Sequence, residues 1–201
     1  MMKIWARGSV AVLAVILGMA AAVMAAGPAD AYSVLRPPKG SKVAIVVFED
    51  LQCPMCAQVS PLLVKAGQQY NIPVVRHDFP IPSHSWSYQA AIIARYFDTQ
   101  SQKLGDEFRE QVFAHQMEIV PGTLRGFAER FAAEHKVDLP FVIDPQRKLA
   151  AEVNADRDTG NRLGINHTPT VYVVNNRPTG QHYVEITDTS QLFQTIDRMR
   201  Q

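Results

Sequence analysis

The hydrophobic pattern of the chain divides into runs typical of buried strands and stretches typical of amphipathic helices. The apolar, β-branched run 43–48 predicts a strand that is buried on both faces. Apolar residues follow at helical spacing from Pro54, and residues 72–79 predict a second strand. Two strands joined by a helix of this length pair in parallel, so the chain is expected to open with a β-α-β unit.

A helical block then interrupts the strands. Segments with helical spacing of apolar residues lie at 87–98, 105–115, 123–135 and 144–162. The runs 170–174 and 182–186 predict two further strands that are able to pair antiparallel, and an amphipathic helix closes the chain. The pattern predicts one α/β domain over residues 32–201, with a helical insertion at about residues 83–140.

The first 31 residues differ in character from this domain. Residues 1–9 carry two basic residues and no acidic one, and residues 10–23 form an unbroken apolar run, as in a secretory signal peptide. Small residues before position 32 predict cleavage after Ala31. The alternative is an uncleaved membrane anchor, because residues 8–26 are just long enough to span a bilayer. In either case we expect a periplasmic or otherwise exported domain.

Composition and charge exclude two classes of protein. With 47% hydrophobic and 19% charged residues, the chain has the composition of a globular protein and is not disordered. Its 20 basic and 19 acidic residues nearly balance, and removal of residues 1–31 leaves 18 of each. A surface that binds nucleic acid usually needs a basic excess. We therefore expect no nucleic-acid partner, and we expect a monomer.

The candidate chemistry lies in the two cysteines, Cys53 and Cys56, which form a Cys-Pro-Met-Cys sequence. A helix that starts at Pro54 places Cys53 at its N-terminus, where free amides and the helix dipole stabilise a thiolate. Cys56 lies about one turn further on, so it can form a disulfide with Cys53 or resolve a mixed disulfide. Outside the cytosol no thiol pool keeps such a pair reduced. The spacing therefore predicts thiol–disulfide exchange at a disulfide that is oxidised at rest.

Metal binding and a static disulfide are the alternatives for these two thiols. Zinc needs about four ligands, and no second Cys-x-x-Cys or paired histidine completes such a set. Copper capture by the two thiolates with His167 or His84 stays open. Met117 and Met199 fit core positions, so no methionine cluster adds to the copper hypothesis. A disulfide across two residues would be a poor structural link. We expect no metal and no cofactor besides the redox-active disulfide.

Two motifs carry a resemblance to a known family. Residues 48–56 read Phe-Glu-Asp-Leu-Gln-Cys-Pro-Met-Cys and match a Phe-x-Asp-x-x-Cys-Pro-x-Cys signature. Residues 164–170 match a Gly-x-x-x-Thr-Pro-Thr loop. Over residues 41–200 the chain resembles the secreted DsbA-like thiol:disulfide oxidoreductases of the thioredoxin superfamily. The resemblance implies a thioredoxin fold, in which helices flank a central mixed sheet, with a helical insertion after the second core strand.

The resemblance also implies how substrate is bound. The Thr168–Pro169 bond should be cis and should pack beside the disulfide, where the adjacent backbone pairs with an extended segment of substrate. An ordinary proline at a strand start is the alternative. The candidate substrate-binding residues are Pro54, Met55, Thr168 and Pro169.

The chain departs from the family pattern at two positions. Val47 stands where thioredoxin and the prototype DsbA carry a buried acid, so Glu49, Asp50 or water is expected to relay protons. The alternative for Glu49 and Asp50 is that both carboxylates are simply solvated at the end of the strand. Met55 replaces the histidine of the prototype, which leaves the redox potential open. His167 is a candidate modulator, because a nearby imidazolium would favour the thiolate.

Together these features predict an enzyme, an exported thiol:disulfide oxidoreductase. The leading hypothesis is a dithiol oxidase that exchanges its Cys53–Cys56 disulfide with thiols of unfolded or reduced exported proteins. Family analogy adds a quinone-linked membrane oxidase as its redox partner. The alternatives are a reductase or isomerase of the same fold, or a non-catalytic copper-binding or chaperone module.

Overall fold

The computed structural model of the protein describes residues 32–201. Four strands in this range form one mixed sheet in the order β2-β1-β3-β4, with β1 and β2 parallel and the other pairs antiparallel. This arrangement confirms the predicted α/β class and the β-α-β opening. In chain order the elements are η1 (Tyr32–Val34), β1 (Val43–Glu49), α2 (Pro54–Tyr70), β2 (Val74–Asp78), α3 (Ser87–Gln100), α4 (Gln102–Ala114), η2 (Gln116–Glu118), α5 (Leu124–Glu134), α6 (Lys148–Arg162), β3 (Thr170–Asn175), β4 (Tyr183–Glu185), η3 (Thr189–Gln191) and α7 (Leu192–Arg200).

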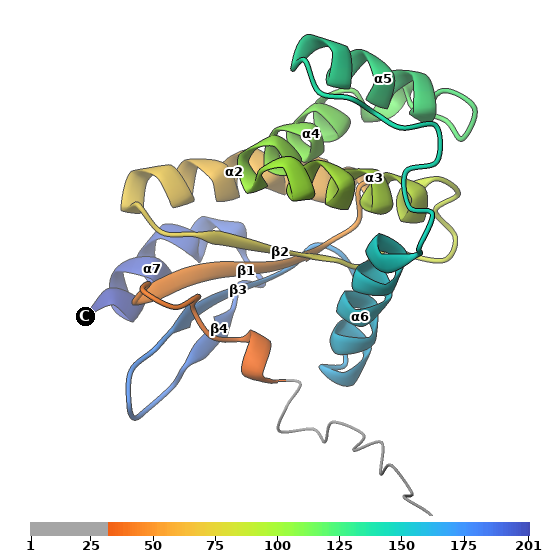
Figure 1. Ribbon diagram of the computed structural model, residues 1–201. Coiled ribbons are helices and arrows are strands. Elements are labelled where there is room, and N and C mark those ends of the chain that lie inside the picture. The colour runs from red at the N-terminus through yellow and green to blue at the C-terminus, as the bar shows by residue number, and fades with distance from the viewer. Residues whose placement is uncertain (1–31) are drawn as a thin grey trace, which may run out of the picture.

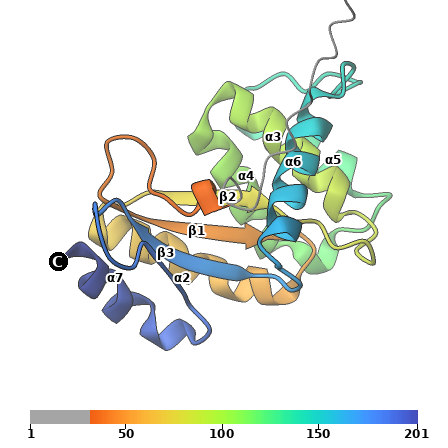
Figure 2. The same cartoon turned by 90° about the horizontal axis from the view of Figure 1, so that it is seen from below.

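Strand β1 forms the centre of the core, and all seven of its residues are buried. Alternate side chains point to opposite faces of a strand, so apolar residues at every position require cover on both sides. Val43, Ile45 and Val47 pack against α2 and α7. The other face, with Val46 and Phe48, packs against η1 and the segments that follow β2 and α6. Figure 2 shows α2 and α7 together on one side of the strands and α6 on the other.

The helical block consists of α3, α4 and α5, which gather above the sheet on the side of α2, whereas α6 stands beside the end of the sheet (Figure 1). Its interior contains a cluster of tilted and edge-on aromatic rings, Phe97, Phe108 and Phe131. The predicted helices at 87–98, 105–115 and 123–135 are confirmed with small shifts of their ends.

The start of α6 differs from the prediction. The sequence pattern suggested a helix from Asp144, but α6 begins at Lys148. Arg147 adopts a left-handed backbone with φ +56°, which interrupts helical geometry at that residue. The Asp144 carboxylate instead accepts a hydrogen bond from the Ala150 amide at 2.8 Å, so it caps the first turn from outside the helix.

Buried ion pairs connect the helical block to the sheet. The Arg109 guanidinium of α4 is 1% exposed, and it donates two 2.8 Å hydrogen bonds to the Asp98 carboxylate of α3. Asp78, at the end of β2, lies 3.8 Å from Arg109 and is paired with Arg95. Arg95 also pairs with Asp156 of α6. Since an unpaired buried charge is costly, these pairs restrict how the helices can sit on the sheet.

The predicted signal peptide, with its cleavage after Ala31, lies outside the described residues. Among residues 32–201, no helix is long and apolar enough to cross a membrane.

Candidate active site

The reactive pair lies where β1 turns into α2. Strand β1 ends at Glu49, and Cys53 is the N-cap residue of α2, with extended backbone and with Pro54 at the first helical position. This confirms the predicted helix start. Both cysteines are buried, whereas Pro54 and Met55 are exposed between them. In this structure both cysteines are free thiols.

The surroundings of Cys53 stabilise its thiolate. A hydrogen bond from the Cys56 side chain is the largest influence on the pKa of Cys53, and it acts against the opposing effect of burial. Together with the Thr168 side chain and the backbone amides of Cys56 and Met55, which also lower the pKa, it brings the pKa of Cys53 to about 5. The Thr168 hydroxyl is buried and has no partner among the described residues while Cys53 is a thiol. It is therefore free to donate a hydrogen bond once the sulfur is ionised.

Thr168 belongs to the second motif, and the fold places it directly beside the first. The Cys53 sulfur lies 3.3 Å from the Thr168 carbonyl oxygen, although 115 residues separate the two in the chain. The Thr168–Pro169 peptide bond is cis. His167 precedes this bond, and its ring is exposed, with Nδ1 lying 3.0 Å from the Asn166 side-chain oxygen. The two motifs thus form one site, at which His167 points its ring nitrogen to a neighbouring amide.

Cys56 has the opposite electrostatic environment to Cys53. Burial raises the pKa of Cys56 well above its ordinary value, and the neighbouring Cys53 sulfur and the charge of Glu49 raise it further. One sulfur is therefore an easily formed anion, and the other is a thiol that holds its proton. This asymmetry distinguishes the attacked sulfur from the resolving one.

Glu49 is not the solvated strand end that the sequence allowed. It is 2% exposed, because the helical block covers the end of β1. One carboxylate oxygen accepts a 2.7 Å hydrogen bond from Arg76, and the other has no hydrogen-bond partner among the described residues. Burial raises the pKa of Glu49, whereas Arg76 and Arg109 lower it. A buried carboxyl group with one free oxygen therefore lies close enough to Cys56 to influence its ionisation.

Asp50 is also buried, at 1% exposure, so the solvated interpretation is wrong for it as well. Its carboxylate accepts 2.7 Å hydrogen bonds from the amides of Gln52 and Ile81, and one oxygen lies 2.8 Å from His84 Nδ1. The Asp50 amide points to the Cys56 sulfur at 3.5 Å. With its oxygens occupied by these donors, Asp50 positions the turn before Cys53.

Two glutamines complete the support of this turn, and no sequence motif points to either of them. Gln116, in η2, donates hydrogen bonds to the carbonyl oxygens of Leu51 at 2.8 Å and Cys53 at 3.1 Å. The Gln52 side chain accepts a 2.9 Å hydrogen bond from the Trp86 amide at the start of α3. Both contacts join segments that are distant in the chain and carry no motif, so only the fold identifies them.

The described residues 32–201 contain no cluster of side chains suited to bind a metal ion. No group of three or more histidine, cysteine, aspartate or glutamate side chains there could hold a metal ion. His84, a candidate copper ligand, faces Asp50.

A helix-capping cysteine, a second buried thiol and a proline loop on a mixed sheet define a thioredoxin-type protein. The thioredoxin family model matches residues 38–192. The chain belongs to the thioredoxin family.

Two curated relatives match part of the chain. Over 153 residues, this chain is 28% identical to the Na(+)/H(+) antiporter NhaA 1 of Salinispora arenicola and 26% identical to the Na(+)/H(+) antiporter NhaA 3 of Salinispora tropica. The match covers 75% of this chain but only 23% of the length of each relative.

Solved structures share the fold. The thiol-disulfide exchange protein alpha-DsbA2 from Wolbachia pipientis has a TM-score of 0.66 at 18% identity, covering 86% of this chain and 94% of that one. A periplasmic thioredoxin-like protein from Salmonella enterica serovar Typhimurium has a TM-score of 0.64 at 19% identity, covering 81% and 87%. Their likeness places the helical block of this chain within a known variant of the thioredoxin fold.

Proposed function

We propose that this protein is an enzyme, a thiol:disulfide oxidoreductase that acts as a dithiol oxidase on unfolded or reduced exported proteins. The observation that carries the proposal is the pairing of an N-cap thiol, Cys53, whose pKa is about 5, with a buried thiol, Cys56, whose pKa is raised. Such a pair separates the roles of nucleophilic and resolving sulfur.

Catalysis starts from the oxidised Cys53–Cys56 pair. A substrate thiolate attacks the Cys53 sulfur, the Cys53–Cys56 bond breaks, and its electron pair passes to Cys56, which takes up a proton. A second substrate thiolate then attacks the substrate sulfur of the mixed disulfide and releases Cys53 as a thiolate. Two substrate thiols thus become one disulfide, while two electrons reduce the cysteine pair. One of the two protons is bound by Cys56 and the other passes to solvent.

Glu49 is the group that exchanges this proton with Cys56. Its free oxygen is buried, and its pKa is raised, so the carboxyl group can carry a proton where solvent has little access. Arg76, which holds the other oxygen at 2.7 Å, fixes the orientation of the carboxyl group. This role takes the place of the acid that is missing at Val47.

The low pKa of Cys53 favours oxidation of substrates over their reduction. A stabilised thiolate makes the reduced form of the enzyme more stable, which raises the reduction potential of the pair. Turnover then requires an electron acceptor, for which we propose a quinone-linked membrane oxidase. The exposed Pro54 and Met55, together with Thr168 and Pro169, form the surface that meets the substrate backbone.

Two variants test the reaction. Cys53→Ser should abolish oxidation of a reduced, unfolded substrate protein. In Cys56→Ser, the Cys53 thiolate should attack the disulfide of the oxidised form of that substrate, release one substrate thiolate and form a mixed disulfide that mass spectrometry detects. Equilibration of the pair with glutathione measures the direction, and a potential well above that of thioredoxin, about −270 mV, supports an oxidase. Turnover by Cys53→Ser, or a potential near that of thioredoxin, would refute the proposal.

We also propose the domain organisation expected from the sequence, a signal peptide over residues 1–31 followed by one domain over 32–201. Mass spectrometry of the protein recovered from an exporting host tests it. A mature N-terminus at Tyr32 supports cleavage after Ala31, and a retained N-terminus supports a membrane anchor.

A further inference from the structure

Glu49 is buried, so a proton that it exchanges with Cys56 needs a further route to solvent. Glu49 is 2% exposed, and one of its oxygens has no hydrogen-bond partner among the described residues. The Arg76 guanidinium holds the other oxygen and also lies 3.4 Å from the Asp106 carboxylate of α4. Arginine does not give up its own protons in proteins, so Arg76 cannot pass this proton on. The route therefore requires another group that both accepts and donates a proton.

A pocket of about 300 Å³ lies between α2 and α4, next to this ion pair. Ser60 lines the pocket from α2, and Glu110 lines it from α4. Glu110 comes four residues after Asp106, on the same face of α4. Partial burial raises the pKa of Glu110, and the nearby charge of Arg76 opposes this rise. The buried ion pair therefore lies close behind the α4 wall of the pocket.

Ser60 brings an unused hydroxyl to the α2 wall of the pocket. Ser60 is 3% exposed, and its hydroxyl oxygen is buried without a hydrogen-bond partner among the described residues. Residues four apart on a helix share a face, with their Cβ atoms about 5–6 Å apart, so Ser60 lies directly behind Cys56. A serine hydroxyl can donate one proton and accept another. Ser60 thus joins the surroundings of the buried sulfur to the pocket.

Pro61 adds a second polar group that favours water in this pocket. Proline has no amide hydrogen, so Pro61 cannot donate the usual helical hydrogen bond to the Ala57 carbonyl four residues earlier. Ala57 and Ser60 both line the pocket, and they offer a carbonyl acceptor and a hydroxyl to a bound water molecule. The pocket volume of about 300 Å³ far exceeds the roughly 10–15 Å³ that one water needs.

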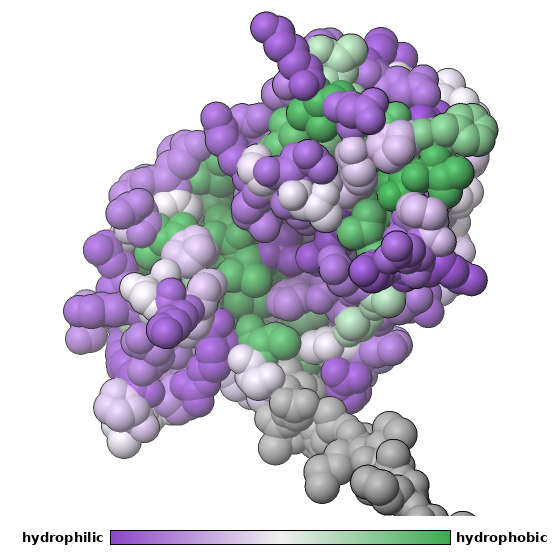
Figure 3. Space-filling model, in the orientation of Figure 1, coloured by the Kyte–Doolittle hydropathy of each residue, from purple (hydrophilic) through white to green (hydrophobic). Residues whose placement is uncertain are grey.

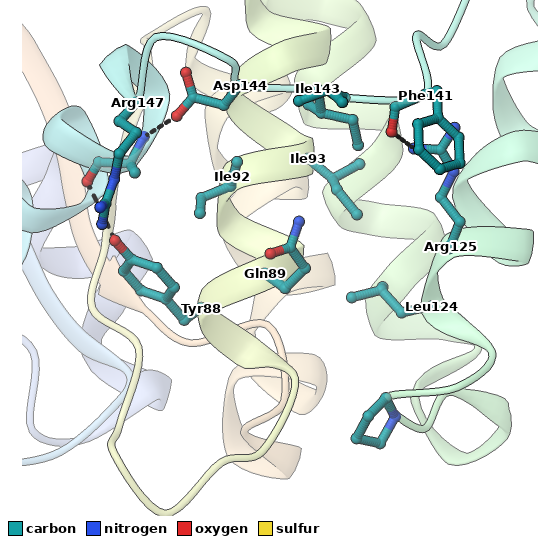
Figure 4. Close-up of a pocket in the computed structure, with 13 residues that line it drawn as sticks. Tyr88, Gln89, Ile92, Ile93, Leu124, Arg125, Phe141, Ile143, Asp144 and Arg147 are labelled. Carbon is teal, nitrogen blue, oxygen red and sulfur yellow. Dashed lines mark hydrogen bonds between the residues drawn. The ribbon is translucent and has the colours of Figure 1, made fainter.

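A larger cavity elsewhere in the helical block offers no comparable group. It has a volume of about 420 Å³ and lies between α3, α5 and residues 141–147 (Figure 4). At its rim, Arg125 donates a 3.1 Å hydrogen bond to the Phe141 carbonyl, and the Arg147 amide donates one of 3.1 Å to the Asp144 carbonyl. Hydrophobic surface gathers over this part of the block, at the right of Figure 3. None of its described lining residues has a buried side-chain polar atom without a partner.

We propose that Ser60 is a proton-relay residue, whose hydroxyl passes protons between Glu49 and water in the pocket between α2 and α4. The inference rests on the proposed function, in which Glu49 exchanges a proton with Cys56. When Cys56 loses its proton, Glu49 accepts it and then gives it to the Ser60 oxygen, while the Ser60 hydroxyl proton passes to a water molecule. Ser60 ends with one proton, as it began, and solvent gains one. The same path runs in reverse when Cys56 takes up a proton.

Exchange of the Cys56 thiol proton with solvent tests this relay in the reduced full chain. At neutral pH Cys53 is a thiolate, because its pKa is about 5, whereas Cys56 keeps its proton. Cys56 is then the source of the S–H stretching band in the infrared spectrum, because the chain has two cysteines. Transfer into D₂O converts this band to S–D. Ser60→Ala should slow the conversion about tenfold or more, as expected for loss of a hydrogen bond to a charged group.

Three variants serve as controls. Ser60→Thr keeps a hydroxyl and should exchange as fast as the native protein. Ser87→Ala removes another buried hydroxyl that has no partner among the described residues, at the start of α3, and should leave exchange unchanged. Glu49→Gln combined with Ser60→Ala should be no slower than the slower single variant, because the two groups act in series. Urea unfolding of Ser60→Ala should show no loss of stability, since the hydroxyl it removes is unpaired.

Several results would overturn the relay. These are native exchange in Ser60→Ala, slow exchange in Ser60→Thr, equal slowing in Ser87→Ala, or slowing in the double variant that multiplies the two single effects. The infrared measurement needs no substrate, so it is independent of the redox reaction. If the native protein fails to oxidise a reduced substrate protein while its thiol exchange still depends on Ser60, the proposed function is wrong and the relay stands.

Discussion

The ionisation of Cys53 tests the electrostatic reasoning most directly. A thiol in an unfolded chain titrates near 8.5, and the folded protein lowers the pKa of Cys53 to about 5. This difference corresponds to on the order of 5 kcal/mol in favour of the thiolate. The hydrogen bond from Cys56 is its largest source. A hydrogen bond to a charged group contributes about 1.5–3 kcal/mol, so its loss should raise the pKa of Cys53 to between about 6 and 7.

Two substitutions at Cys56 make this measurable. Cys56→Ala removes the donor, whereas Cys56→Ser keeps a hydroxyl donor at the same position. The ultraviolet absorbance of the thiolate, followed against pH in each variant, gives the pKa of the single remaining cysteine. The Ser variant should titrate near the native value of about 5 and the Ala variant above it. Equal titration of the two variants, or a native pKa near 8.5, would contradict the assignment.

The same ionisation links folding stability to pH. The unfolded thiol binds a proton below about pH 8.5, whereas folded Cys53 releases it down to about pH 5. The free energy of unfolding of the reduced protein should therefore gain this contribution as pH rises from 5 to 8.5. It should lose the contribution as pH falls through 5. The Cys53→Ser variant lacks it, so chemical denaturation of both proteins across this range isolates the effect.

Three further substitutions test the proton path and the packing. Glu49→Gln removes the proposed proton-transfer group, so it should slow substrate oxidation at least about tenfold and remove one ionisation from the pH profile of the rate. The pKa of Cys53 should change little. An unchanged pH profile would exclude the proposed role of Glu49. Arg109→Met leaves the partly buried Asp98 carboxylate without its cation and removes one of the two cations beside buried Asp78, so it should lower the free energy of unfolding in urea by about 3–5 kcal/mol, and a loss below about 1 kcal/mol would contradict this reading. Gly160→Ala would place a Cβ 2.6 Å from the Phe79 ring and should destabilise by about 1–3 kcal/mol. The matched Gly126→Ala, whose nearest neighbour is 3.7 Å away, should leave stability unchanged or raise it by up to about 1 kcal/mol.

Much of the fold follows from local sequence pattern. The buried run of β1, the helix start at Pro54 and the amphipathic helices of the block depend on periodicity and backbone sterics, which act between near neighbours in the chain. For the same reason the place of Cys53 at a helix N-terminus was predictable, because it needed only the strand end and the proline beside it.

The sequence by itself determined the strands, the helices and the chemistry of the cysteine pair. Only the tertiary structure decided the environment of that pair. Glu49 and Asp50 occupy a strand end that would be solvated in isolation, but the helical block and the loop after β2 cover it. Because of the same packing, Gln116 contacts the active-site turn, and Met117, which the sequence pattern placed in the core, is exposed. Burial and hydrogen bonding depend on which distant segments meet, and periodicity along the chain does not carry that information.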